Sequence, residues 1–127
     1  PDRGSYLRWL TIYAACFEPA LCDKGLKRES GSRNMNPYGE YDALMDMLIA
    51  QLKKGPYLLG ERLTAVDLLW ATTLWWCTAF GLVEPHPTIT RYIEQLVHRP
   101  SFVEANKVDA ELAAEQEVLQ ASEQKAS

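Results

Sequence analysis

The most hydrophobic segment of this 127-residue chain, residues 65–80, most constrains the folds that the chain can adopt. Its apolar residues show no strict alternation, and it contains Trp70, Trp75 and Trp76, three of the four tryptophans in the chain. A segment of this length that is apolar on nearly all sides is typical of a helix surrounded by other elements. We therefore expect residues 65–80 to form the central helix of the domain.

The residues around the start of this helix form the sharpest local motif of the sequence, Leu-Thr-Ala-Val-Asp-Leu at 63–68. Thr64 is expected to be the N-cap, with its hydroxyl facing the backbone N–H of Asp67 while the Asp67 carboxylate faces the N–H of Thr64. This is a capping box with Asp in place of Glu, and Leu63 and Leu68 would add a hydrophobic staple. Asp67 could also be a catalytic acid or base, but a carboxylate at this position is usually structural. We interpret Thr64 and Asp67 as a structural capping box.

Two further helices are expected before the central one. Asp2 can cap a first helix with a wide apolar face, which Pro19 kinks or ends. The polar segment 23–35 contains Gly and Ser and is interpreted as a mobile surface loop. A second helix is expected to open with Asn36 as its cap and Pro37 at its first position.

The pattern stays helical after the central helix. Residues 87–98 have apolar side chains at helical spacing, and a short helix is expected at 102–105. The tail that follows is rich in Ala and Glu and is either a frayed helix or disordered. The sequence therefore predicts an all-α bundle of about five helices, with one helical domain over residues 1–107 and a C-terminal tail over residues 108–127.

Composition argues against several classes of function. Thirteen Lys and Arg against seventeen Asp and Glu give a formal charge of -4, and no basic stripe interleaves with the aromatic residues, so nucleic acid is not an expected partner. No apolar run approaches the roughly 18 to 20 residues that span a bilayer, so no membrane association is expected. The three cysteines occur in no CxxC motif and fit reduced thiols, which favours a cytoplasmic protein without a metal site.

Three segments of the sequence carry a resemblance to a known family. They are RWLTIYAACFEPAL, PYLLGERLTAVDLLWATTLWW and YIEQLVHRPSFVEA. In this order and at this spacing they resemble the first helix, the capped core helix and the penultimate helix of one domain. That domain is the C-terminal all-helical domain of glutathione S-transferases, and the resemblance is to the bacterial, cytosolic members.

The resemblance implies a division of labour between two domains. In such transferases an N-terminal thioredoxin-like domain binds glutathione and holds the Ser, Tyr or Cys that activates its sulfur. That domain is expected to be absent here, so the resemblance implies an inactive fragment with no catalytic residue of its own. It further implies glutathione as a substrate, a small hydrophobic electrophile as the co-substrate, a role in detoxification, and a homodimer in the full-length protein.

The resemblance also suggests a hydrophobic wall for the co-substrate. Trp76 matches a Trp that lines the hydrophobic substrate site in similar bacterial enzymes, and Tyr13, Phe17 and Phe80 are further candidates. Aromatic side chains can hold electrophiles by stacking and by burial of area without specific hydrogen bonds. Each of the four could instead pack in the core, which is the usual place of aromatic residues at helical spacing.

Three polar residues of the first helix are candidates to lie near glutathione. Thr11 and Glu18 belong to a stripe that approaches glutathione or the neighbouring subunit in bacterial relatives. Glu18 could hold the glutathione ammonium group or a water, or it could be a solvated carboxylate. Arg8 could pair with a glutathione carboxylate, or with Asp2, Glu40 or solvent.

Two other interpretations remain open. The chain could be a non-catalytic module of the same fold that serves protein association, or an unrelated helical bundle in which the capping motif is a coincidence. The gene sequence upstream of the chain distinguishes the first of these from a transferase. A βαβ pattern with a cis-Pro segment and a Ser, Tyr or Cys near its start would favour the transferase.

Overall fold

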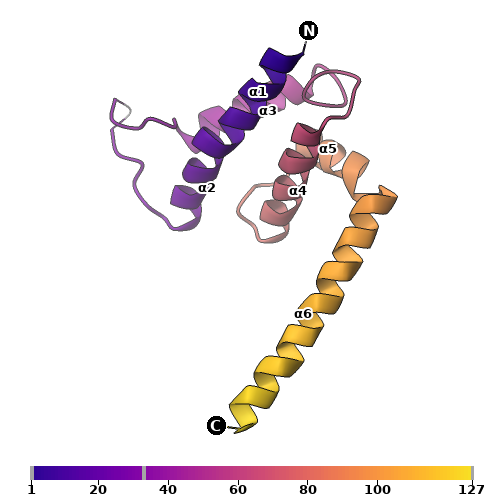
Figure 1. Ribbon diagram of the computed structural model, residues 1–127. Helices are drawn as coiled ribbons and strands as arrows, with labels where there is room; N and C mark the ends of the chain where they lie inside the picture. The colour runs from indigo at the N-terminus through magenta and orange to yellow at the C-terminus, as the bar shows by residue number, and fades with distance from the viewer. Residues whose placement is uncertain (1, 33, 127) are drawn as a thin grey trace. The chain divides into compact units, whose positions relative to one another are not determined.

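The computed structural model describes residues 2–32 and 34–126, and these residues form helices joined by turns (Figure 1). The elements are α1 (Arg3–Ile12), the π-helical turn η1 (Tyr13–Phe17), α2 (Glu18–Gly25), α3 (Tyr41–Leu52), α4 (Ala65–Ala79), α5 (Pro87–Val97) and α6 (Pro100–Ala126). Because α1, η1 and α2 follow one another without a break, the described residues make five helical segments and no strand. An isolated antiparallel bridge joins Tyr57 and Gly60. The prediction of an all-α domain of about five helices is confirmed.

The chain divides into two compact units, residues 1–94 and residues 95–127. The first unit contains α1 to α4 and most of α5, and the second contains the end of α5 and α6. The helix α6 passes residue 107 without interruption, and the division of a domain from a tail at that residue stays a prediction.

An aromatic cluster around Trp70 of α4 forms one part of the core of the first unit. The Trp70 ring lies 4.8 Å from Phe17, 5.4 Å from Tyr13 and 5.9 Å from Trp9, measured between ring centroids. The indole N–H of Trp70 donates a hydrogen bond of 3.1 Å to the carbonyl oxygen of Trp9, which satisfies its one polar group. These contacts pack the first helix against α4. The side chains of α4 that are buried are Val66, Asp67, Trp70, Ala71, Leu74 and Cys77.

The first helical segment continues through Pro19 to Gly25, so the alternative that Pro19 ends the helix is wrong. Proline lacks the N–H that an α-helix would pair with the carbonyl four residues earlier. The π turn Tyr13–Phe17 comes directly before this point, and the backbone N–H of Glu18 bonds to the carbonyl of Tyr13, five residues back. The wider turn carries the chain past the proline. As a result the first three residues of the predicted loop 23–35 are helical, and Arg33 of that loop lies outside the described residues.

Asp2 and Asn36 occupy different roles from those predicted. Asp2 stands at the N-cap of α1 without a capping hydrogen bond, and its carboxylate accepts a bond of 3.1 Å from Arg62. The Asn36 side chain accepts bonds of 3.1 Å from the backbone N–H groups of Tyr38 and Gly39. It therefore closes a local turn and does not cap α3, which begins at Tyr41. Gly39 has a φ of +82°, a value that side chains with a Cβ rarely adopt, and this residue separates the turn from the helix.

The helix α6 is much longer than the short helix predicted at 102–105. It runs for 27 residues from Pro100 to Ala126. The tail, for which the sequence left a frayed helix and disorder as alternatives, is therefore helical. Its side chains from Lys107 to Ser122 are exposed. The scarcity of buried side chains explains why the hydrophobic pattern did not reveal its length.

Candidate functional site

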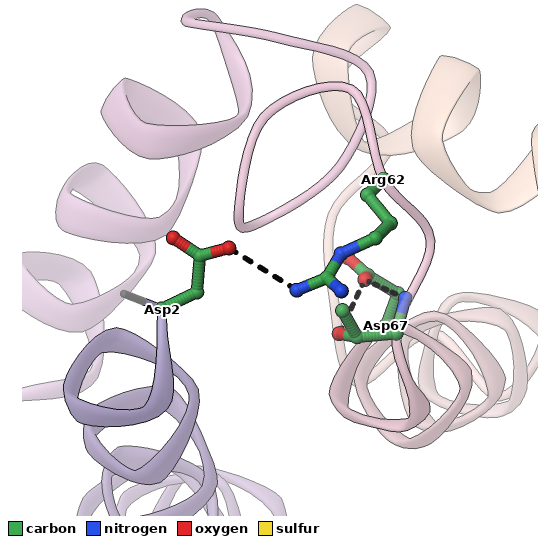
Figure 2. Close-up of polar contacts among 4 residues, drawn as sticks. Asp2, Arg62 and Asp67 are labelled. Carbon is green, nitrogen blue, oxygen red and sulfur yellow. Dashed lines mark hydrogen bonds and ion pairs between the residues drawn. The ribbon is translucent and has the colours of Figure 1, made fainter.

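The start of α4 carries the capping box that the sequence predicts. Thr64 has an extended backbone, and both halves of the box are present. The Asp67 Oδ2 atom accepts a bond of 2.9 Å from the Thr64 backbone N–H and a second bond of 2.9 Å from the Thr64 hydroxyl. Figure 2 shows the Asp67 side chain at this helix start, with Arg62 nearby reaching toward Asp2. The hydroxyl bond is additional to the predicted pattern and fixes the Thr64 side chain on the carboxylate.

The second carboxylate oxygen of Asp67 joins parts of the chain that are distant in sequence. Its Oδ1 atom accepts a bond of 2.8 Å from the backbone N–H of Leu58 and one of 2.9 Å from the Tyr92 hydroxyl of α5. Asp67 has no exposed surface, so these four hydrogen bonds take the place of the water that its side chain would bind at the surface. Burial raises the pKa of Tyr92, and the Asp67 charge and hydrogen bond raise it further. The Tyr92 phenol therefore stays protonated as a donor, and Asp67 serves as a structural centre.

Both backbone groups of Leu58, in the loop between α3 and α4, form hydrogen bonds to side chains. While the Leu58 N–H bonds to Asp67, its carbonyl accepts a bond of 2.7 Å from the side-chain amide of Gln51 on α3. Arg91 of α5 donates a bond of 2.7 Å to the carbonyl of Leu52, the last residue of α3. This polar network fixes the start of α4 relative to α3 and α5.

Trp76 and Phe80 form an exposed aromatic pair at the C-terminal end of α4. Their rings are stacked, with centroids 5.2 Å apart and planes inclined by 22°. Trp76 is 50% exposed and Phe80 is 69% exposed, and the Trp75 ring meets the Trp76 ring edge-on at 5.8 Å. An exposed aromatic pair can accept an apolar ligand by stacking. Of the four aromatic residues expected in the substrate wall, these two have surface available for a ligand.

Tyr13 and Phe17 are buried and have almost no surface that a substrate could contact. Phe17 has no exposed surface, and its ring packs on Trp70. Tyr13 is 8% exposed, and its hydroxyl lies 2.7 Å from the Thr73 hydroxyl on α4. Thr73 has one hydroxyl proton and donates it to the Leu69 carbonyl at 3.0 Å, so Tyr13 is the donor in the pair. Tyr13 and Phe17 therefore pack in the core, which was the alternative to a place in the substrate wall.

The three candidate glutathione-proximal residues are all exposed, and they do not gather at one point. Glu18 lies close enough to Tyr13 that its charge helps to raise the pKa of the Tyr13 phenol, an effect for which burial is the main cause. Arg8 lines a separate cavity of about 240 Å³, together with Ser5 and Gln51. Thr11 is an exposed residue of α1. A role for any of them toward glutathione stays a prediction.

The described residues contain no group of three or more His, Cys, Asp or Glu side chains that could hold a metal ion. Burial raises the pKa of the Cys77 thiol, so this cysteine is a small buried side chain and a poor nucleophile. In the part of the chain that the structure describes, no helix has both the length and the apolar character to cross a membrane.

Fold and site together define an all-helical domain with a capped, buried core helix and an exposed aromatic pair at the end of that helix. Residues 38–95 match the family model described as glutathione S-transferase, C-terminal domain. The matched segment contains α3, α4 with its capping box, and most of α5. No curated protein matches the chain, and no solved structure does. The match supports a glutathione S-transferase-like C-terminal domain, in agreement with the resemblance.

Proposed function

We propose that this chain is the co-substrate-binding C-terminal domain of a cytoplasmic glutathione S-transferase of the bacterial type. A thioredoxin-like domain supplies the glutathione site, and the complete protein conjugates glutathione to small apolar electrophiles in detoxification. The family match over residues 38–95 supports the domain assignment. The observation that carries the substrate proposal is the exposed Trp76–Phe80 pair, an apolar surface that the core does not require.

The chemistry divides between the two domains. A hydroxyl or thiol of the thioredoxin-like domain stabilises glutathione as its thiolate, and the thiolate attacks an electrophilic carbon held against the aromatic pair. The contribution of Trp76 and Phe80 is to bind the electrophile and to exclude water from it. Arg8, Thr11 and Glu18 are the residues proposed to lie near glutathione, because they are exposed polar side chains on the first helical segment.

The substrate proposal is tested by Trp76→Ala in the gene product that contains this chain behind its thioredoxin-like domain. We expect the KM for an aryl halide to rise about two- to tenfold, because an aromatic stacking partner contributes roughly 0.5 to 1.5 kcal/mol. The KM for glutathione should not change. Steady-state kinetics with each substrate varied in turn measure both values.

Leu68→Ala is the matched control, since Leu68 is also a partly exposed apolar residue of α4 and lies near the opposite end of the helix. An unchanged KM for the aryl halide in the Trp76 variant would refute the proposed wall. If the gene product conjugated no aryl halide at all, the non-catalytic module for protein association would be the better assignment.

A further inference from the structure

The helix α6, which Figure 1 shows as one unbroken helix, carries exposed apolar side chains along most of its length. Val108, Leu112, Val118 and Leu119 are between 44% and 70% exposed. Residues 108, 112, 115 and 119 follow one another at intervals of four, three and four residues. This spacing places their side chains on one face of a helix over about three turns. We call these four residues the α6 stripe, in which Glu115 is the one charged member.

A hollow of about 480 Å³ lies at the C-terminal end of the α6 stripe. Its lining is mostly apolar and includes Ala114, Glu115, Val118 and Leu119. Residues 114 and 118 form one row of side chains along the helix surface, and residues 115 and 119 form the next row. When two helices pack, the groove between two such rows receives side chains of the other helix. The shape of this surface therefore fits a second helix.

The charge of α6 is strongly negative. Residues 100–126 contain six acidic and two basic side chains, and the rest of the chain contains eleven of each, so α6 carries the whole formal charge of -4. Asp109 and Glu111 border the α6 stripe, and Glu115 lies within it. Among the residues that the structure describes, no ion pair involves Asp109 or Glu115. Charges that border an apolar seam determine which helices pair, so these carboxylates favour a positively charged partner.

A second copy of α6 matches this surface poorly. In a parallel pair each member of the stripe faces its own counterpart, so two Glu115 carboxylates would face each other. In an antiparallel pair that overlaps along the whole stripe, Glu115 would face Leu112 of the other copy, which places a carboxylate against an apolar side chain. Both arrangements also bring together two helices of the same negative charge, which repel each other.

We infer that the α6 stripe binds a basic amphipathic helix of another protein. The apolar residues of that helix pack on the valine and the two leucines of the stripe, and a Lys or Arg opposite Glu115 pairs with its carboxylate. Basic residues at the bordering positions face Asp109 and Glu111. The side chains of α6 from Lys107 to Ser122 are exposed, so a partner would also supply the packing that the helix lacks. The inference does not depend on the proposed transferase activity.

The test uses a fluorescein-labelled peptide of about 21 residues, or three heptads, with Leu at the core positions, one central core Lys, and Lys at the bordering positions. The complete chain is titrated into this Lys peptide, and fluorescence anisotropy measures the binding. We expect saturable binding that weakens as salt is added. Leu112→Gln should weaken it about tenfold, because the change removes an apolar contact and keeps a good helix former. Glu115→Gln should weaken it about threefold, as expected for one partly solvated charge pair.

Glu117→Gln is the matched control, because it removes the same charge from an exposed residue on the opposite face of α6 and should leave the affinity unchanged. Circular dichroism of each variant verifies the helix content. A peptide with Glu in place of every Lys should not bind.

The absence of saturable binding of the Lys peptide would overturn the inference. So would equal binding of the Glu-substituted peptide, or an equal loss in the Glu115 and Glu117 variants. A light-scattering mass above that of the monomer that Leu112→Gln abolished would also overturn it, because the occupant of the stripe would then be a second copy of this chain.

Discussion

Asp67 joins three segments of the first unit through hydrogen bonds to its carboxylate. Its two carboxylate oxygens accept bonds from the backbone of Thr64 and Leu58 and from the hydroxyls of Thr64 and Tyr92. The sequence predicts the local half of this network, because the capping box needs only a spacing of three residues. It does not predict the bonds to Leu58 and Tyr92, which lie nine and 25 residues away and depend on how the loop and α5 fold back.

Asp67→Asn should destabilise the chain by about 3 kcal/mol, because an amide has one acceptor oxygen and presents a donor group to the donors on its other side. Urea unfolding followed by circular dichroism measures the change. Tyr92→Phe removes a single bond of the network and should cost about 1 kcal/mol. A loss in Asp67→Asn no larger than that in Tyr92→Phe would show that the network is not the main support of the helix start.

Tyr41 should make stability depend on alkaline pH. Its pKa is about 12 in the folded chain against an ordinary value of 10.0, so the unfolded chain releases the phenol proton first. The contribution of Tyr41 is therefore fully present below pH 10 and is lost as the pH rises from 10 to 12. Urea midpoints across this range should fall less steeply in Tyr41→Phe than in the parent chain. Parallel curves would contradict this assignment.

A helix start could be predicted from the sequence where the residues that fix it lie within one turn of each other. The start of α4 follows from Thr64 and Asp67, which act within one turn. The start of α3 was mispredicted because Asn36 and Pro37 have the chemistry of a helix start and also of an isolated turn, and Gly39 ends the turn before a helix can continue. Likewise, the exposed position of Trp76 and the burial of Phe17 depend on which face each helix turns to its neighbours, a matter that spacing alone leaves open.

The helix α6 should be the least protected element. Its side chains from Lys107 to Ser122 are exposed, so little tertiary packing supports its backbone hydrogen bonds. In native-state hydrogen exchange followed by mass spectrometry, peptides from 108–122 should exchange well before peptides covering Trp70 to Leu74. Equal protection of the two segments would mean that α6 gains a partner in solution.

At the scale of the whole molecule, we propose that the chain forms a weak homodimer through the first helical segment. Leu7 and Leu10 lie three residues apart on α1 and are 47% and 37% exposed, a pair that association would bury. Multi-angle light scattering should show a mass that rises from 14.4 kDa toward twice that value with concentration. Leu10→Glu should keep the mass at the monomer value, whereas Leu68→Glu on α4 should not. Identical behaviour of the two variants would place the contact elsewhere.

The hydrogen bonds of Leu58 to Asp67 and Gln51 also limit where residues can be inserted into or deleted from this protein. An added or deleted residue between α3 and α4 would shift Leu58 out of register with two partners at once, so natural variation in length should concentrate elsewhere. Among the residues that the structure describes, no residue of the exposed segment 26–32 has hydrogen bonds at both its backbone N–H and its carbonyl. An epitope tag or a fluorescent label would therefore be tolerated better there than in the connection that leads into the core helix.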